Sequence, residues 1–322
     1  MKDVSVGEFR QALPAPPAVT LGAHVRRAAA GFWLRSLFFF AQHAPGIARA
    51  TKGLFVWGAY TFSQSIRAGT GANGQRILGS GVDDATLRRF GRGVVGSFYD
   101  FVCDVGRSRG MSRPDLLRLI DGIEGDHKYH AARASGRGAI VVTAHMGSFE
   151  VGLAALLERD PRIHVVFKRD VGRFERIRQG LRQRLGVVEQ PVDDGWGVWI
   201  KLRDALRADE VVAIQGDRVM PGQKGRRMAV LGGHLLLPTG PVKLAMASGA
   251  PIVPVFSVRT PGGKIRLFIE DAIEVGDDID EALGRVAAVI GRYVAAYPEQ
   301  WLVLHPAFEE DAAAAGPGEQ GS

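Results

Sequence analysis

The sequence predicts an α/β protein in which a central, mostly β layer is flanked by helices and preceded by a helical N-terminal section. Three observations lead to this prediction. From residue 139 onward, short β-branched runs alternate with helical stretches, as is typical of a sheet covered by helices. Before that point, apolar residues recur at helical spacing. Finally, 46% of the 322 residues are apolar, so a large core can form.

The composition changes along the chain and divides it into four parts. Residues 1–19 are an N-terminal extension, 20–135 a mainly helical section, 136–310 the α/β core, and 311–322 a low-complexity tail that we expect to be disordered. Because no linker-like stretch separates the helical section from the core, we expect the two to form one continuous domain.

Helical spacing is clearest in residues 86–105, where apolar side chains repeat every three or four positions. Another helix is expected to begin at Pro114, with Ser112 as its cap. Six runs in the core predict strands: Ala139–Thr143, Ile163–Phe167, Val187–Val188, Val211–Gln215, Ile252–Val258 and Ile265–Ile269. The stretches between them predict helices: Phe149–Glu158, Arg173–Leu185, Val198–Ala208 and Pro241–Ser248.

The charge of the chain favours an anionic partner. There are 41 basic and 34 acidic residues, which gives a net charge of +7. Such a surface suits nucleic acid, an anionic membrane or an acidic carrier protein. The basic residues are dispersed and are not clustered with stacking aromatics, which argues against nucleic acid. Cys103 is the only cysteine, so an intramolecular disulfide is excluded, and this fits a reducing compartment.

Two apolar stretches near the N-terminus bear on membrane contact. A spanning helix needs about 20 mostly apolar residues, but 28–41 is interrupted by Arg35 and 53–62 is too short. Met1–Arg10 carries two acids and no apolar run follows directly, so we expect no cleavable signal. We expect residues 28–62 to lie on an anionic membrane surface, and the alternative is two core helices of a soluble protein.

Several short matches to known motifs do not predict sites. Gly69–Gly74 and Gly91–Gly96 both fit G-x-G-x-x-G, but each lies in helical sequence, whereas a dinucleotide loop must follow a strand. Asp126, His127 and His130 form at most a partial metal set, and polar residues in a loop are usually just solvated. We therefore expect no nucleotide or metal site at these positions.

The stretch AIVVTAHMGSFEVG, residues 139–152, places His145 after a predicted strand and Glu150 in the first turn of a predicted helix. On one continuous helix the two side chains would point about 140° apart. If His145 stands in the loop before the helix, Glu150 can accept a hydrogen bond from one imidazole nitrogen and leave the other as a general base. Ser148 is the expected helix cap. The structural alternative is a strand-end histidine and a glutamate favoured by the helix dipole.

His145-Met-Gly-Ser-Phe-Glu150 resembles the His-x4-Asp/Glu motif of the lysophospholipid acyltransferase superfamily. Other stretches resemble, in the same order, blocks of its bacterial lipid A biosynthesis branch, the lauroyl and myristoyl acyltransferases. These stretches are Val165–Arg169, the basic helix ending Arg182-Gln-Arg184, Val211–Arg218, Val230–Gly233 through Leu237–Pro241, Ser248–Val255, and Pro298–Trp301 with His305 and Phe308. The likeness covers roughly residues 139–310 and implies a glycerolipid acyltransferase-like fold.

The resemblance implies an enzyme that moves a fatty acyl chain from an acyl thioester to a hydroxyl of a lipid A-type glycolipid, with His145 and Glu150 as the catalytic pair. The donor would be acyl carrier protein or CoA thioester, with no further cofactor. Gly216-Asp-Arg218 departs from the branch's usual acidic pair, so a phosphatidylinositol mannoside-type or other polar lipid remains an alternative acceptor. A catalytically silent lipid-binding protein of the same fold is the alternative from another class. The implied location is the cytoplasmic face of the bacterial inner membrane, held peripherally.

The resembling blocks also suggest residues that bind substrate. Asp217 and Arg218 are expected at a strand end near the site, where Arg218 would bind an anionic headgroup or the donor phosphate, unless the two form a structural ion pair. Arg182 and Arg184 would clamp an acceptor phosphate or steady an oxyanion, unless they form a solvated helix face. His305 is expected to be a packed structural histidine. The remaining expected substrate-binding residues are Lys168, Arg169, Gly147 and Thr239.

Overall fold

The computed structural model describes residues 36–169, 173–219 and 223–309, without the side chains of 173–177. The described residues from Leu37 onward belong to one compact unit. The extension 1–19 and the tail 311–322 expected from the sequence lie outside the described residues.

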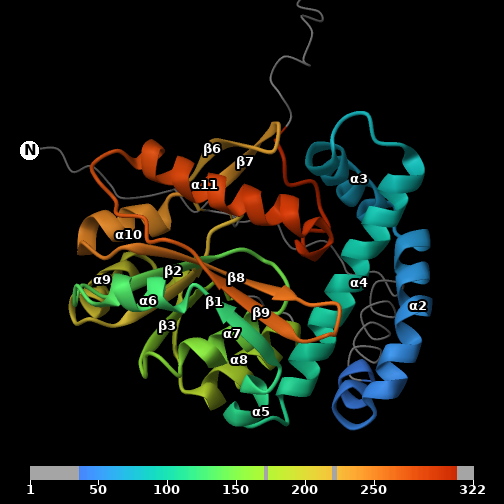
Figure 1. The fold of residues 1–322 in the computed structure, drawn as a ribbon, viewed down its shortest axis with the longest axis horizontal. Helices are drawn as coiled ribbons and strands as arrows, with labels where there is room; N and C mark the ends of the chain where they lie inside the picture. The colour runs from blue at the N-terminus through green and yellow to red at the C-terminus, as the bar shows by residue number, and fades with distance from the viewer. Residues whose placement is uncertain (1–35, 170–172, 220–222, 310–322) are drawn as a thin grey trace, which may run out of the picture. The chain divides into compact units, whose positions relative to one another are not determined.

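A seven-stranded sheet in the order β1-β9-β8-β2-β5-β3-β4 forms the centre of this unit (Figure 1). Strands β8, β2, β5, β3 and β4 run parallel, β9 is antiparallel to β8, and β1 is parallel to β9. The predicted class, a mostly β layer flanked by helices, is confirmed. The strands are β1 (Ile120–Glu124), β2 (Ala139–Thr143), β3 (Ile163–Phe167), β4 (Val188–Pro191), β5 (Val211–Gln215), β8 (Ile252–Arg259) and β9 (Ile265–Ile269).

Helices cover both faces of the sheet, and a helical section precedes it. That section contains α2 (Pro45–Phe62), α3 (Gln64–Leu78), α4 (Asp84–Ser108) and α5 (Arg113–Leu117). The remaining helices are α6 (Asp126–Arg133), α7 (Phe149–Leu156), α8 (Arg173–Leu185), α9 (Trp196–Arg207), α10 (Gly240–Ser248), α11 (Ile279–Ala296) and the 3-10 turns η1 (Val192–Asp194) and η2 (Pro298–Gln300).

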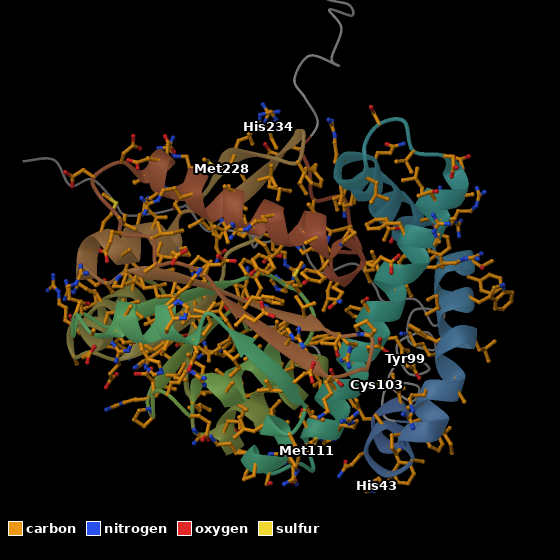
Figure 2. All side chains as sticks on the ribbon, viewed as in Figure 1. His43, Tyr99, Cys103, Met111, Met228 and His234 are labelled. Atoms are coloured by element: carbon orange, nitrogen blue, oxygen red, sulfur yellow. The ribbon has the colours of Figure 1, made fainter. Side chains whose placement is uncertain are left out.

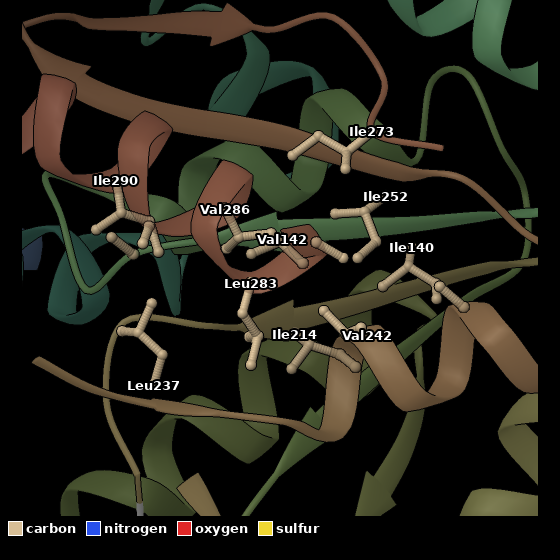
Figure 3. Packing of buried hydrophobic residues seen from close by; sticks show 14 of the residues in the cluster. Ile140, Val142, Ile214, Leu237, Val242, Ile252, Ile273, Leu283, Val286 and Ile290 are labelled. Carbon is tan, nitrogen blue, oxygen red and sulfur yellow. The ribbon is translucent and has the colours of Figure 1, made fainter. Parts of the chain in front are cut away.

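The alternation of side chains along the strands creates two apolar layers. On one face the sheet packs against α9, α10 and α11, and Figure 3 shows this cluster from close by. Its labelled members include Ile140, Val142, Ile214 and Ile252 from strands, and Val242, Leu283, Val286 and Ile290 from helices. On the other face, Val141 and Val253 pack with Tyr129 of α6 and Leu153 of α7. Each such side chain, when fully buried, contributes roughly 1.5–3 kcal/mol.

The connections of β2 and β5 leave the sheet on opposite faces. β2 is followed by α7, which covers one face, whereas β5 leads through a hairpin to α10 on the other face. Because the chain diverges here, the carboxyl ends of these two neighbouring strands are the place where α/β proteins commonly bind ligands.

Most of the predicted core elements are confirmed, with small shifts at their ends. The helix α11, an edge strand and a hairpin were not predicted. The edge strand β1 lies inside the section expected to be mainly helical, and its sequence IDGIE has no β-branched run. The hairpin of β6 (Gly225–Val230) and β7 (Gly233–Pro238) turns at Leu231 and Gly232, which both have positive φ. Leucine rarely adopts that conformation, so its sequence does not indicate a two-residue turn.

The helical section agrees with several local expectations. Ser112 caps α5 through a reciprocal capping box with Asp115. The glycine-rich stretch 69–74 lies in α3 and 91–96 lies in α4, so neither forms a nucleotide-binding loop. Residues 28–35 lie outside the described part. In the described ranges, none of the helices combines the length and the apolar character that crossing a membrane requires.

Candidate active site

His145 and Asp217 meet at the carboxyl ends of β2 and β5. The parallel register pairs Thr143 with Gln215, and the Gly216 amide donates to the Thr143 carbonyl at 2.8 Å. Two residues further along each chain, the Nδ1 of His145 lies 2.7 Å from Oδ1 of Asp217. The backbone amide of His145 donates to Oδ2 of the same carboxylate at 3.1 Å. Asp217 therefore holds both the ring and the backbone of His145.

The Asp217 carboxylate is fully buried but well compensated. Its Oδ2 also accepts a hydrogen bond from the indole Nε1 of Trp301 at 2.9 Å. Burial raises the pKa of Asp217, but His145, the hydrogen bonds from His145 and Trp301, and the charge of Arg218 together hold that pKa well below its ordinary value of 3.8. The carboxylate is thus ionised at neutral pH and can accept a hydrogen bond from the imidazole.

An ionised Asp217 determines which imidazole nitrogen carries the proton. Since the carboxylate only accepts, Nδ1 of a neutral His145 donates to it, and the lone pair lies on Nε2. Nε2 in turn lies 3.0 Å from a terminal nitrogen of Arg218, which donates to it. The buried Nε of Arg218 has no hydrogen-bond partner among the described residues. The expected position of Asp217 and Arg218 at a strand end is confirmed, and both contact His145.

Gly147 allows the loop after His145 to pack closely on the neighbouring strand. Its φ is +55°, and a Cβ at this position would overlap the carbonyl oxygen of Ser257 in β8. The Gly147 amide donates to the Gln300 carbonyl at 3.1 Å. The predicted close backbone approach is confirmed, and no larger residue fits this turn without a shift of the loop.

The predicted hydrogen bond between Glu150 and His145 is wrong. Glu150 lies in the first turn of α7 as expected, but its carboxylate is buried and pairs with Arg178, while Arg182 lies 3.9 Å away. Two cations on α8 therefore attract Glu150 away from the imidazole. Ser148 stands at the N-cap of α7 as predicted, but its side chain makes no capping hydrogen bond.

Of the two arginines for which a solvated helix face was the alternative, Arg182 is buried and Arg184 is exposed. The Arg182 side chain is 1% exposed, donates to Glu189 at 2.8 Å and lies 4.8 Å from the centre of the Phe167 ring. Arg184 donates to the carbonyl oxygens of Ser108 and Arg109. Those oxygens lie at the C-terminus of α4, so Arg184 neutralises a helix end.

Two of the other predicted substrate-binding residues, Arg169 and Thr239, are held by other parts of the fold. Arg169 pairs with Asp194, and its backbone amide donates to Asp193, so it fastens the end of β3 to η1. Lys168 is half-buried beside it. Thr239 is buried at the N-cap of α10, where its side chain makes no capping hydrogen bond. Substrate contact by these residues stays a prediction.

A segment that follows α11 closes the site from the C-terminal side. Trp301 is buried and forms an isolated antiparallel bridge with Met146, and the Leu302 amide donates to the His145 carbonyl at 2.7 Å. The side chain of Gln300 accepts from the backbone amide of Arg259 at 2.7 Å and donates to the carbonyl of Arg259 at 2.8 Å. The segment therefore fastens the His145 loop to β8.

Asn73 of α3 holds the continuation of this closing segment. Its amide nitrogen lies 2.9 Å from the carbonyl of His305 and 3.3 Å from that of Val303, and its oxygen accepts from the Ala307 amide at 2.9 Å. One turn earlier on the same face, a Cβ at Gly69 would overlap the carbonyl of Leu304. The stretch 69–74 is thus a helix surface shaped to receive a backbone segment.

His305 lies near the site, and the structure places it differently from the packed histidine expected. His305 is exposed. Partial desolvation of the ring, together with the charges of Arg218 and His145, lowers the pKa of His305. The residues considered as a partial metal set are engaged elsewhere, since Asp126 pairs with Arg159 and His130. Among the described residues, no group of three histidine, cysteine or carboxylate side chains is placed to hold a metal ion.

A cavity of about 100 Å³ lies between the sheet and α7. Most of its lining is apolar, with Val141, Val255 and Leu153 among the contributing side chains. Phe149 lines this cavity, and its ring also meets the His145 ring edge-on at 6.0 Å between centres. The cavity therefore begins one side chain away from the imidazole.

Sequence reasoning missed the partnership of His145 with Asp217 and the role of Trp301. The signal for Asp217 was present, because two strands of equal length each end two residues before a titratable residue. Neighbouring parallel strands place such residues side by side. For Trp301, nothing in local sequence indicates which carboxylate it bonds, since 84 residues separate the two.

Comparison with known proteins agrees with this geometry. The residue pattern of the family described as bacterial lipid A biosynthesis acyltransferase matches residues 84–310, well over half of the chain. The matched region starts with α4 and includes His145, Asp217 and Trp301.

Individual relatives are more distant. A phosphatidylinositol mannoside acyltransferase of Mycobacterium tuberculosis is 27% identical over 223 residues, which is 65% of this chain. The matched region spans 66% of that relative, just under two thirds of its length. A phosphatidylinositol mannoside acyltransferase of Mycolicibacterium smegmatis is 26% identical over 227 residues, which is 68% of this chain and 72% of the relative.

Proposed function

Because the chain belongs to the bacterial lipid A biosynthesis acyltransferase family, we propose that it transfers an acyl group from an acyl thioester to a hydroxyl of a polar lipid. The observation that carries the proposal is the His145–Asp217 pair, in which a buried carboxylate accepts from Nδ1 at 2.7 Å and leaves Nε2 as the basic nitrogen.

In the proposed reaction, Nε2 of His145 removes the proton of the acceptor hydroxyl as its oxygen attacks the thioester carbonyl carbon. Asp217 stabilises the imidazolium that forms. The tetrahedral intermediate then collapses, the carbon–sulfur bond breaks, and the imidazolium gives its proton to the departing thiolate. The products are an ester and a thiol, and no covalent bond to the protein is needed.

The guanidinium of Arg218 donates a hydrogen bond to Nε2 of His145, the nitrogen that must act as the base. In the proposed reaction the acceptor hydroxyl takes its place at Nε2, so the guanidinium moves aside by a change of side-chain rotamer. Its Nε, which has no partner among the described residues, and its charge then suit an anionic group, either the oxyanion of the intermediate or a phosphate of donor or acceptor.

We assign the donor to the acyl thioesters of acyl carrier protein or of CoA, both of which carry acidic groups suited to a chain of net charge +7. The apolar cavity beside Phe149 supports an acyl donor, since a dry apolar cavity takes up apolar groups. Its lining also includes Glu150 and Arg182.

For the acceptor we propose a glycolipid hydroxyl, of lipid A type in line with the family. A phosphatidylinositol mannoside-type acceptor is the second candidate, because the relatives described above carry that name. Acceptors of either kind are membrane lipids, so the protein would work peripherally, at the cytoplasmic face of the inner membrane. This fits the absence, within the described ranges, of a helix suited to cross a bilayer.

The deciding experiment supplies radiolabelled acyl-acyl carrier protein or acyl-CoA with total bacterial lipid and separates the lipid products. We expect wild type to label one lipid class and His145→Ala to lose at least ~100-fold in rate, the lower range for a lost general base. Mass spectrometry of the labelled lipid identifies the acceptor. Equal labelling by His145→Ala would contradict the mechanism. A wild type that binds lipid but never labels it would favour a silent lipid-binding protein.

A further inference from the structure

One side of α2 exposes large apolar side chains in water. Ile47, Leu54, Trp57 and Phe62 are 47%, 70%, 51% and 78% exposed. At 100° per residue the first three fall within one third of the helix circumference, and Phe62 continues the strip at the helix end. From Ile47 to Phe62 the strip runs about 22 Å along the helix. We call these four residues the α2 strip.

The opposite side of α2 is fixed on α4, so the strip has a defined orientation. The Tyr99 hydroxyl donates to the Ala48 carbonyl at 2.6 Å, and Lys52 pairs with Asp100 at 2.7 Å. The Phe55 ring lies 5.2 Å from that of Tyr99. Figure 1 shows α2 running along the side of α4 that faces away from the sheet, and Figure 2 labels Tyr99 on α4. The strip is therefore held outward by contacts that do not use it.

The surroundings of the strip are basic. Residues 9–82 contain eight of the 41 basic residues and none of the 34 acidic ones, so the rest of the chain is close to neutral. Within that range Arg49 is exposed on α2 itself, and Arg67 donates to the carbonyls of Tyr60 and Thr61 at its C-terminus. A surface with an apolar strip, an exposed tryptophan and exposed arginine nearby complements an anionic bilayer.

We infer that the α2 strip is the surface by which this protein docks on anionic membranes, with Leu54 and Trp57 entering the headgroup boundary and Arg49 contacting lipid phosphates. The inference rests on the proposed function in that the acceptor would be a membrane lipid, and it names the surface that brings the site to it. An acidic carrier protein would suit the charge, but exposed leucine, tryptophan and phenylalanine in one strip favour a bilayer.

The test measures flotation with vesicles of phosphatidylcholine alone and of phosphatidylcholine with phosphatidylglycerol. The variant is Leu54→Asp/Trp57→Asp, and Leu54→Ser/Trp57→Ser removes the apolar groups without adding charge. The matched control is Ile200→Asp/Trp196→Asp on α9, whose side chains are 52% and 86% exposed and undergo the same chemical change elsewhere. We expect both α2 variants to lose at least ~10-fold in affinity for anionic vesicles, and the α9 control to bind like wild type.

The other outcomes separate this inference from the proposed function. Loss of binding by the α9 pair alone, or equal binding of wild type to both kinds of vesicle, would overturn the inference. The inference would also be overturned if wild type bound neither kind of vesicle but bound immobilised acyl carrier protein, and the α2 variants lost that binding. Acyl transfer to a detergent-dispersed acceptor should survive in the α2 variants. If wild type binds anionic vesicles through the strip but transfers no acyl group, only the proposed function fails.

Discussion

At the scale of single residues, Asp217 and Arg218 act on different nitrogens of one imidazole. Asp217 holds Nδ1 and the His145 amide, whereas Arg218 donates to Nε2. The contact with Asp217 leaves the lone pair on Nε2, so this nitrogen can act as a base. The contact with Arg218 occupies the same lone pair in the absence of a substrate hydroxyl. Arg218 therefore competes with the acceptor for Nε2. Its own Nε, without a partner among the described residues, favours a conformation in which it meets an anion.

Replacing Asp217 by Asn should remove the orientation of the base while keeping the volume. An Asn amide can donate to Nδ1 and so select the tautomer with its proton on Nε2, so we expect acyl transfer to fall at least ~100-fold.

The pKa of Asp217 is lowered by folding, so its ionised form stabilises the fold above its ordinary pKa of 3.8, and this contribution is lost as pH falls through the lowered value. Denaturation at pH 7 should show that Asp217→Asn lowers the free energy of unfolding by about 2 kcal/mol, and the difference should shrink in acid.

Glu150→Gln is the matched control, since it changes the other buried carboxylate of the region. Glu150 compensates Arg178 and Arg182, so this variant should lose stability, while the folded fraction keeps its rate within ~10-fold. A variant at Glu150 that loses as much activity per folded molecule as the one at Asp217 would restore the direct His–Glu pair and contradict the arrangement described here.

The difference between Glu150 and Asp217 explains how far the site could be predicted. Sequence spacing brings His145 and Glu150 to one strand–turn–helix unit, and both were found there. Which carboxylate faces the ring depends on long-range partners: Arg178 on α8 attracts Glu150, and Trp301 steadies Asp217. Such competition between charges distant in sequence leaves no local pattern.

At the scale of elements, α3 is connected to the site through the segment that follows Trp301. Asn73 makes three hydrogen bonds to the segment after Trp301, and that segment holds the His145 carbonyl and Asp217. Asn73 is thus a positioning residue, which acts on catalysis only through the closing segment.

Asn73→Ala should lower kcat by ~10-fold and leave KM for the donor nearly unchanged, because the base loses orientation while the donor site persists. Thr70→Val is the control: Thr70 is also buried in α3, but its hydroxyl donates to Ile66 in its own helix. Both variants should unfold at lower denaturant concentration. Steady-state kinetics that show equal kcat losses in both would mean that Asn73 matters only for stability.

Strands and helices could be predicted wherever a single local pattern, such as a β-branched run or helical spacing, determines the structure. Runs such as Ile163–Phe167 are β-branched and bounded by polar sequence, so the strand was predicted to the residue. The strand β1 exists because β9 offers it an edge to pair with, and the β6–β7 turn tolerates Leu231 at positive φ because the two strands pair along their length. Both depend on tertiary contacts, which propensity does not report.

At the scale of the whole molecule, the order of the strands determines where chemistry can occur. Fold class and alternation of strands and helices were read from the sequence, but strand order was not, since nothing local states that β5 lies between β2 and β3. That order makes β2 and β5 neighbours whose connections leave on opposite faces, and it brings His145 and Asp217 together at their carboxyl ends. The α2 strip and the exposed Arg49 belong to this scale too, because we infer that they form the surface that docks on a membrane.

The contact of Asn73 with the closing segment has a consequence for the timing of folding. Asn73 and Val303 are 230 residues apart, so their meeting closes a very long loop and should come late. On refolding from denaturant, we expect far-UV circular dichroism to recover first and acyl transfer to return after a measurable lag, longer in Asn73→Ala. Simultaneous recovery of both signals would contradict this order. During synthesis, α3 emerges long before the closing segment. A chain stopped before Trp301 would contain His145 and Asp217 but would lack the indole that donates to Asp217 and the amide that donates to the His145 carbonyl.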